Sequence, residues 1–179
     1  MLITQAHYAD PEAVRQLTEG LDRGLDLGGR EPLFLCIGSD RHILDCFAPL
    51  IGTMLSGMVP GISLYGTLDQ PLHAKNMIKE LREIRNAHTD RLEIAIDASL
   101  GAGTDIGFIK LKQDSLLPGK AFAKSLPPIG QISIIGIVGT RTDRYTVSSL
   151  TSGSLAHVYH MAVVVAEAIA QWYQSSVIR

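Results

Sequence analysis

The stretch Leu33-Phe34-Leu35-Cys36-Ile37-Gly38 is an uninterrupted apolar run that ends in a glycine. A continuous apolar run of this length is typical of a strand covered on both faces in a parallel sheet. A turn-rich stretch, residues 39–44, comes next, and apolar residues then recur at helical spacing from Phe47 to Leu55 until Gly57. We therefore predict a strand, a loop and a helix, which together form a unit of an α/β fold.

The same alternation of strand and helix patterns extends over the rest of the chain. Further strands are predicted at residues 62–65, 92–96, 108–111 and 132–138, and further helices at residues 11–25, 72–86 and 155–173. The pattern predicts a three-layer α/β/α sandwich with a mostly parallel sheet. The length of the chain predicts a single domain over residues 1–179, with residues 1–30 as an N-terminal helical appendage.

Composition narrows the class of protein. Of 179 residues, 46% are hydrophobic, which is enough for a sizeable core and excludes intrinsic disorder. The 16 Lys+Arg and 18 Asp+Glu leave a net charge of -2, so neither a nucleic acid nor a membrane surface is an expected partner. The two cysteines do not suggest a disulfide framework, and no signal peptide pattern opens the chain, so we expect a cytoplasmic protein.

Two aspartates follow predicted strands. Asp97 directly follows Ile94-Ala95-Ile96, and Asp45 closes the loop that leaves the first strand. Ligands of open parallel sheets bind at the carboxyl ends of the strands, so both side chains are candidates for one crevice. Two close carboxylates cannot both ionise cheaply, so one keeps a proton and the pair can act as acid and base. The pattern favours hydrolysis without a metal.

Other uses of these residues stay open at this point. Asp45 is equally suited to an N-cap, and Asp97 to a turn that ends a strand. Cys46 near a helix start, with a histidine base, is a further candidate nucleophile. Metal binding would use oxygen and imidazole ligands, although no dedicated ligand spacing is present; the candidates are Asp40, His42, Asp45, His73 and Asp97.

Several ordered blocks of sequence resemble the YyaC family of sporulation proteins over residues 33–138. These blocks are Cys36-Ile37-Gly38-Ser39-Asp40-Arg41, Pro49-Leu50-Ile51-Gly52, Tyr65-Gly66-Thr67-Leu68, Pro71-Leu72-His73-Ala74, Ile94-Ala95-Ile96-Asp97-Ala98-Ser99-Leu100-Gly101, Pro118-Gly119-Lys120 and Leu126-Pro127-Pro128-Ile129-Gly130. That family is similar to germination proteases and to hydrogenase maturation endopeptidases, which share a phosphorylase/hydrolase-like α/β/α fold.

The resemblance implies a site. The two aspartates implicated in the germination proteases fall on Asp45 and Asp97, the residues chosen above from topology. In the maturation endopeptidases the corresponding acids bind nickel with a histidine, which has no counterpart between Pro118 and Val138, so we expect no metal and no cofactor. The chain departs from its relatives at His42-Ile43-Leu44 and at Ala48, which predicts a more crowded approach to Asp45.

We therefore expect a spore-associated peptidase of the cytoplasm or forespore that acts on a protein or peptide substrate through Asp45 and Asp97. Candidates for substrate binding or support of the acids are Asp40, Arg41, His73 and Ser99. The alternatives are a non-enzymatic sporulation binding or scaffold protein and a metal-dependent maturation-type endopeptidase. Residues 113–130 are a candidate lid or substrate groove, and the apolar last helix is suited to a homo-oligomer.

Overall fold

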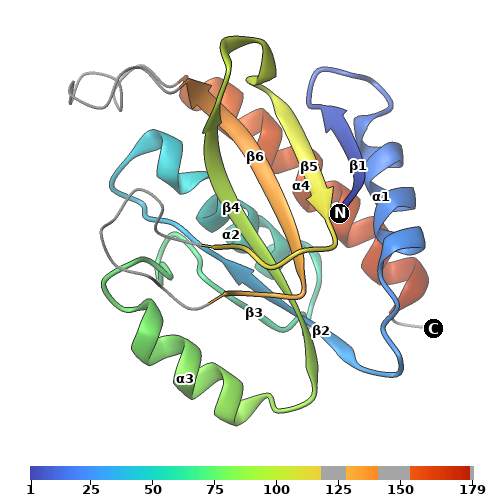
Figure 1. Cartoon of the computed structure of the whole chain (residues 1–179), viewed down its shortest axis with the longest axis vertical. Helices are drawn as coiled ribbons and strands as arrows, with labels where there is room; N and C mark the ends of the chain where they lie inside the picture. Colours follow the sequence, from blue (N-terminus) through green and yellow to red (C-terminus); the bar gives the residue numbers. More distant parts are fainter. Residues whose placement is uncertain (118–127, 141–153, 178–179) are drawn as a thin grey trace.

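The computed structural model describes residues 1–117, 128–140 and 154–177, and it contains one six-stranded sheet (Figure 1). The strand order across the sheet is β1-β5-β6-β4-β2-β3. The strands are β1 (Leu2–His7), β2 (Glu31–Cys36), β3 (Leu64–Tyr65), β4 (Arg91–Gly101), β5 (Phe108–Lys112) and β6 (Ile132–Thr140).

Most of this sheet is parallel. Strand β2 pairs in parallel with both β3 and β4, and β4 pairs in parallel with β6. Only β5 runs against its neighbours, because it is antiparallel to both β6 and β1. The predicted mostly parallel sheet is confirmed.

Helices cover both faces of the sheet (Figure 1). They are α1 (Ala13–Gly24), α2 (Phe47–Met58), α3 (Met77–Ala87) and α4 (Leu155–Ser176), with short 3-10 turns η1 (Ile43–Cys46) and η2 (Gly103–Asp105). Buried side chains of α1, α2 and α4 share one apolar cluster with one face of the sheet, and those of α3 share a second cluster with the other face. The predicted three-layer α/β/α arrangement is confirmed.

Strand β2 shows why its sequence is continuously apolar. Phe34 and Cys36 belong to the cluster under α1, α2 and α4, whereas Leu33, Leu35 and Ile37 belong to the cluster under α3. Successive side chains of a strand point to opposite faces, so a strand with a helix layer on each side needs apolar residues at every position.

The first 30 residues hold a strand in addition to the expected helix. Strand β1 forms the edge of the sheet beside β5, and α1 packs against β1 and α4. Strand β1 was not predicted from the sequence, because its residues are mixed in polarity and partly exposed, as expected for an edge strand. This segment is therefore integrated with the sheet and the helix layer.

Two further boundaries differ from the sequence prediction. Helix α3 begins at Met77, not at Leu72, and Ile78, which was predicted on the apolar face, is 60% exposed. Strand β4 continues past Asp97 to Gly101, so Asp97 lies inside a strand. In the part of the chain that the structure describes, no helix combines the length and apolar character needed to cross a bilayer.

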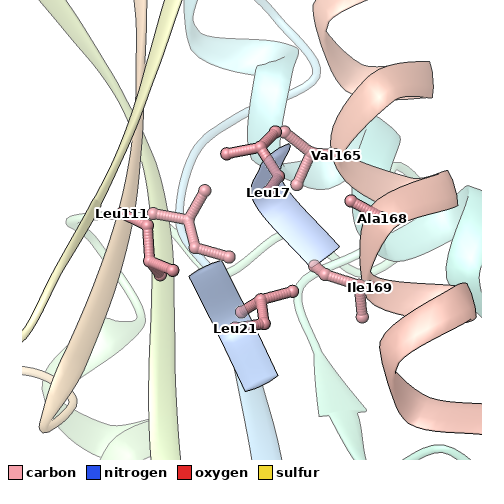
Figure 2. A pocket seen from close by; sticks show the side chains of 7 residues that line it. Leu17, Leu21, Leu111, Val165, Ala168 and Ile169 are labelled. Atoms are coloured by element: carbon pink, nitrogen blue, oxygen red, sulfur yellow. The ribbon is translucent and has the colours of Figure 1, made fainter. Parts of the chain in front are cut away.

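Figure 2 shows a small apolar void between α1, α4 and the sheet. It is lined by Leu17, Leu21, Leu111, Ile134, Val165, Ala168 and Ile169. Its volume of about 10 Å³ and its apolar lining are those of an imperfection in core packing. This void is not a candidate ligand site.

Glycines let the chain pass closely over the carboxyl end of β2. Gly66 has φ +93°, and a Cβ there would overlap the carbonyl oxygen of Cys36. Gly38 lies against the backbone of Asp45, and a Cβ there would overlap the Asp45 carbonyl oxygen. The close approach of these segments at the end of β2 therefore requires residues without a side chain.

We expect Gly66→Ala to lower the free energy of unfolding by at least about 2 kcal/mol, because it adds a backbone clash to an unfavourable φ. Gly57→Ala is the matched control, since nothing lies within 4 Å of a Cβ at this helical position. The control should be neutral or slightly stabilising. Urea unfolding followed by circular dichroism measures both, and equal stability of the two variants would contradict the prediction.

Candidate functional site

Three consecutive residues at the carboxyl end of β2 form backbone hydrogen bonds to three neighbouring segments. The backbone N–H groups of residues 37–39 donate, in order, to the carbonyl oxygens of Ile96 (2.8 Å), Leu72 (2.9 Å) and Asp45 (3.1 Å). The first acceptor lies in β4, the second in the segment before α3, and the third in η1. One short piece of backbone therefore fixes the relative positions of three segments.

Each of these segments brings a candidate residue to the site. Asp97 follows Ile96 in β4, His73 follows Leu72, and Asp45 belongs to the third segment itself. Asp97 lies two residues after Ala95 in β4, and side chains two residues apart in a strand point to the same face. Because Ala95 packs in the cluster under α3, the Asp97 side chain is also on the α3 face of the sheet. The predicted convergence of candidate residues at the carboxyl ends of the strands is thus met by the backbone geometry.

Asp97 is a partly buried carboxyl with an altered ionisation. Burial, and to a smaller extent the negative charge of Asp45, raise its pKa to about 8 against the lowering effect of one hydrogen bond. That bond is donated by the backbone N–H of Ala98 to Oδ1 over 2.8 Å. At neutral pH Asp97 is therefore mostly protonated, and it is close enough to Asp45 to respond to its charge.

Asp45, unlike Asp97, has charged neighbours that favour its ionised form. Burial raises its pKa above the ordinary value, while the charges of His42 and His73 and the backbone N–H of Ser39 lower it. The N-cap interpretation of Asp45 is wrong, because Cys46 occupies the N-cap of α2 and no side chain caps η1 or α2. Its carboxyl is thus free of a helix-capping role.

The other candidate residues have different positions. Asp40 and Arg41 are exposed, and the buried Ser39 hydroxyl accepts the backbone N–H of Arg41 over 3.2 Å. Ser99 lies two residues beyond Asp97 in β4, on the same face, and donates to the carbonyl of Leu100 over 3.5 Å. The structure therefore brings the segment of His73 to that of Asp45, and it leaves Asp40 and Arg41 exposed.

Two chemical alternatives receive no support from the geometry. Burial and the neighbouring Asp45 charge raise the pKa of the Cys46 thiol, which donates to the Ile43 carbonyl over 3.0 Å, so it is a poor nucleophile. Within residues 1–117, 128–140 and 154–177, no three or more His, Cys, Asp or Glu side chains form a group able to hold a metal ion.

Asn76 was not among the site residues predicted from the sequence. Its Oδ1 accepts the backbone N–H of His73 over 2.9 Å, and its Nδ2 donates to the carbonyl of Pro71 over 3.0 Å. Asparagine before a helix is a recognised signal, but the predicted helix began at Leu72 and so enclosed this position. A helix start placed at Met77 would have identified Asn76.

The candidate lid at residues 113–130 is only partly described. Leu116 and Ile129 pair through two backbone hydrogen bonds of 2.8 and 2.9 Å. Residues 118–127, which include the Pro118-Gly119-Lys120 block, lie outside the described residues. A separate groove of about 660 Å³ lies at the other end of the sheet, where Leu2, Leu92 and Ile132 begin their strands, far along the strands from Asp97.

The fold is that of an α/β/α protein with a mostly parallel sheet, and its two candidate acids belong to segments that meet at the carboxyl end of β2. The chain belongs to the family described as "Protein of unknown function (DUF1256)", which matches residues 5–168. It is also 35% identical over 133 residues to "Uncharacterized protein YyaC" of Bacillus subtilis (strain 168). This alignment covers 73% of the present chain and 65% of that relative. The resemblance to the YyaC family is confirmed.

The raised pKa of Asp97 predicts a specific pH dependence of stability. In the unfolded chain an aspartate ionises near pH 3.9, whereas in the folded chain Asp97 ionises near pH 8. The unfolded state therefore loses its proton first, and the contribution of Asp97 to stability falls as pH rises from about 4 to 8. Asp97→Asn should gain at least about 1 kcal/mol in free energy of unfolding relative to wild type at pH 8 compared with pH 5.

Denaturant unfolding at both pH values measures this difference. Asp90→Asn is the control, because Asp90 is exposed and precedes β4 at the opposite end of the strand. A constant difference between Asp97→Asn and wild type at the two pH values would show that Asp97 ionises normally in the folded protein.

Proposed function

We propose that this protein is a peptidase in which Asp45 and Asp97 activate water for hydrolysis of a peptide bond. The observation that carries the proposal is the hydrogen-bonded junction of residues 37–39, which joins the segment of Asp45 to β4, where burial raises the pKa of the Asp97 carboxyl to about 8. A protonated and an ionised carboxyl near each other supply the acid and the base that amide hydrolysis needs.

The reaction follows from this pair of protonation states. Asp45 takes a proton from water as the water oxygen bonds to the carbonyl carbon of the peptide. Asp97 gives its proton to the carbonyl oxygen, and a gem-diol is formed. Asp45 then passes its proton to the amide nitrogen, the C–N bond breaks, and a gem-diol hydroxyl returns a proton to Asp97. The result is one carboxylic acid and one amine, with both aspartates restored.

The resemblance to the germination proteases supports this chemistry and suggests its setting. Two aspartates are implicated in catalysis by those proteases, and by resemblance they fall on Asp45 and Asp97, so small acid-soluble spore proteins are the first substrates to test. On this proposal the protein acts without a metal, on protein or peptide chains, in the cytoplasm of a spore-forming cell or in its forespore.

A second candidate function is binding of a protein partner without turnover. The observation that favours it is the exposure of large apolar side chains: Ile43, two residues before Asp45, is 41% exposed. Helix α4 adds Leu155, 56% exposed, and Tyr159, 47% exposed, and α4 packs against η1. Such residues are suited to an interface, including one between two copies of this chain.

The peptidase proposal predicts cleavage of purified small acid-soluble spore proteins by the wild-type protein in the presence of a chelator. Asp45→Asn and Asp97→Asn should each lose at least about a hundredfold in kcat/KM, because each removes one partner of the proton transfer. Activity of the wild type should fall above about pH 8, where Asp97 loses its proton. Gel electrophoresis and mass spectrometry of the products follow the reaction.

Asp90→Asn should cleave as the wild type does, since its exposed carboxyl lies at the other end of β4. All variants must first show wild-type circular dichroism. Cleavage that survives both active-site substitutions would eliminate the aspartate pair, and an inactive wild type would favour the binding function.

A further inference from the structure

The groove at the amino-terminal end of the sheet has no part in the proposed reaction. Its volume is about 660 Å³, and it lies where β1, β4 and β6 begin and where β5 ends. The end of α1 and the connection from α1 to β2 also line it. Leu92, in its lining, precedes Asp97 by five residues of extended strand, or roughly 16 Å. A groove of this size accommodates a small organic molecule at a distance from the two acids.

The floor of the groove is apolar. Leu25, Leu92 and Ile132 line it, and each of the three is at most 8% exposed. All three belong to the cluster under α1, α2 and α4. The groove therefore opens directly onto the end of the main core, where an apolar group of a ligand would be removed from water.

Two arginines line the same groove. Arg23 lies in the last turn of α1, and Arg30 directly precedes β2. The Nε of Arg23 donates to the Glu19 carbonyl and the Nε of Arg30 to the Leu27 carbonyl, each over 3.3 Å. Each guanidinium is thus held through Nε, and its two Nη groups extend beyond that contact.

These two guanidinium groups have no acidic partner among the residues that the structure describes. Arg15, Arg85 and Arg91 each form an ion pair with a glutamate, whereas Arg23 and Arg30 form none within residues 1–117, 128–140 and 154–177. A guanidinium presents a planar set of donors that matches a carboxylate with two parallel hydrogen bonds. The Nη groups of Arg23 and Arg30 are therefore available to an external anion.

The remaining polar groups of the lining are consistent with a singly charged anion. Asp26 contributes one negative charge, and its Oδ1 already accepts the N–H of Gly28 over 3.0 Å. The Oε1 of Gln131 accepts the N–H of Glu93 over 2.7 Å, which leaves its Nε2 as a donor. Two arginines and one aspartate give the lining a net charge of +1, which suits a carboxylate better than the nearly double charge of a phosphate.

We infer that this groove binds a small organic carboxylate with an apolar body. The carboxylate is bound by Arg23 and Arg30, and the apolar body lies over Leu25, Leu92 and Ile132. The inference is independent of the proposed peptidase function, because none of these residues belongs to the segments of Asp45 and Asp97 that meet at the carboxyl end of β2.

The test is a titration of the nitrogen-15-labelled protein with sodium octanoate, followed by the NMR shifts of the backbone amides. Octanamide, which has the same chain and no charge, is titrated in parallel. Octanoate should give saturable shifts at the amides of Leu25, Leu92 and Ile132. It should bind at least about tenfold more tightly than octanamide, because only the carboxylate forms charge-assisted hydrogen bonds to the guanidinium groups.

Substitution of the arginines separates their role from that of the apolar floor. Arg23→Gln and Arg30→Gln should each weaken octanoate binding at least about fivefold and leave octanamide binding unchanged. Arg30→Lys keeps the charge but loses the planar donor set, so its affinity should fall between those of Arg30→Gln and the wild type. Arg82→Gln removes an exposed arginine of α3, outside the groove, and is the matched control with wild-type affinity.

Three results would overturn the inference in variants that keep wild-type circular dichroism. They are equal affinities for octanoate and octanamide, octanoate affinity that survives in the Arg23→Gln/Arg30→Gln double variant, and octanoate shifts that are absent or lie away from the groove. Asp45→Asn and Asp97→Asn should bind octanoate as the wild type does. Octanoate binding in a protein that cleaves no peptide would therefore support the groove while the peptidase proposal fails, and peptide cleavage without octanoate binding would do the reverse.

Discussion

The arrangement of the site depends on three backbone hydrogen bonds donated by residues 37–39 at the end of β2. Their acceptors belong to β4, to the segment before α3 and to η1, which are far apart in the sequence. Backbone groups buried at such a junction must find partners, so the three segments are held in one geometry. Glycine at position 38 lets the chain lie against the backbone of Asp45 at this point. Together with the parallel pairing of β2 and β4, this junction holds the segments of Asp45, His73 and Asp97 in one arrangement.

Glu93 and Asp97 lie on the same face of β4, but their surroundings shift their pKa values in opposite directions. Burial would raise the pKa of Glu93, but two 2.7 Å hydrogen bonds from Arg85 and one from the N–H of Gly130 lower it below the ordinary value. Asp97, four residues further along, has one backbone donor and the like charge of Asp45 nearby. Glu93 is therefore a paired ion that joins α3 to the sheet, whereas Asp97 keeps a proton that it can give away.

Much of this architecture was predictable, because the patterns involved are local. The run at residues 33–37 is continuously apolar since helices cover both of its faces. The edge strand β1 escaped prediction because half-exposed positions carry no strict alternation. The position of Asn76 was hidden by a helix predicted to start too early, since Leu72 is buried through a strand-like bridge to Ile37 and imitates the first apolar position of a helix.

The sequence by itself determined the class of fold and identified Asp45 and Asp97, because residue type and position after a strand are visible in one dimension. Only the tertiary structure decided how these acids ionise. A pKa depends on burial and on the charges of residues distant in sequence, such as Asp45 for Asp97 and His73 for Asp45. Those neighbours are brought together by strand order and by the hydrogen bonds of residues 37–39, which no local pattern encodes.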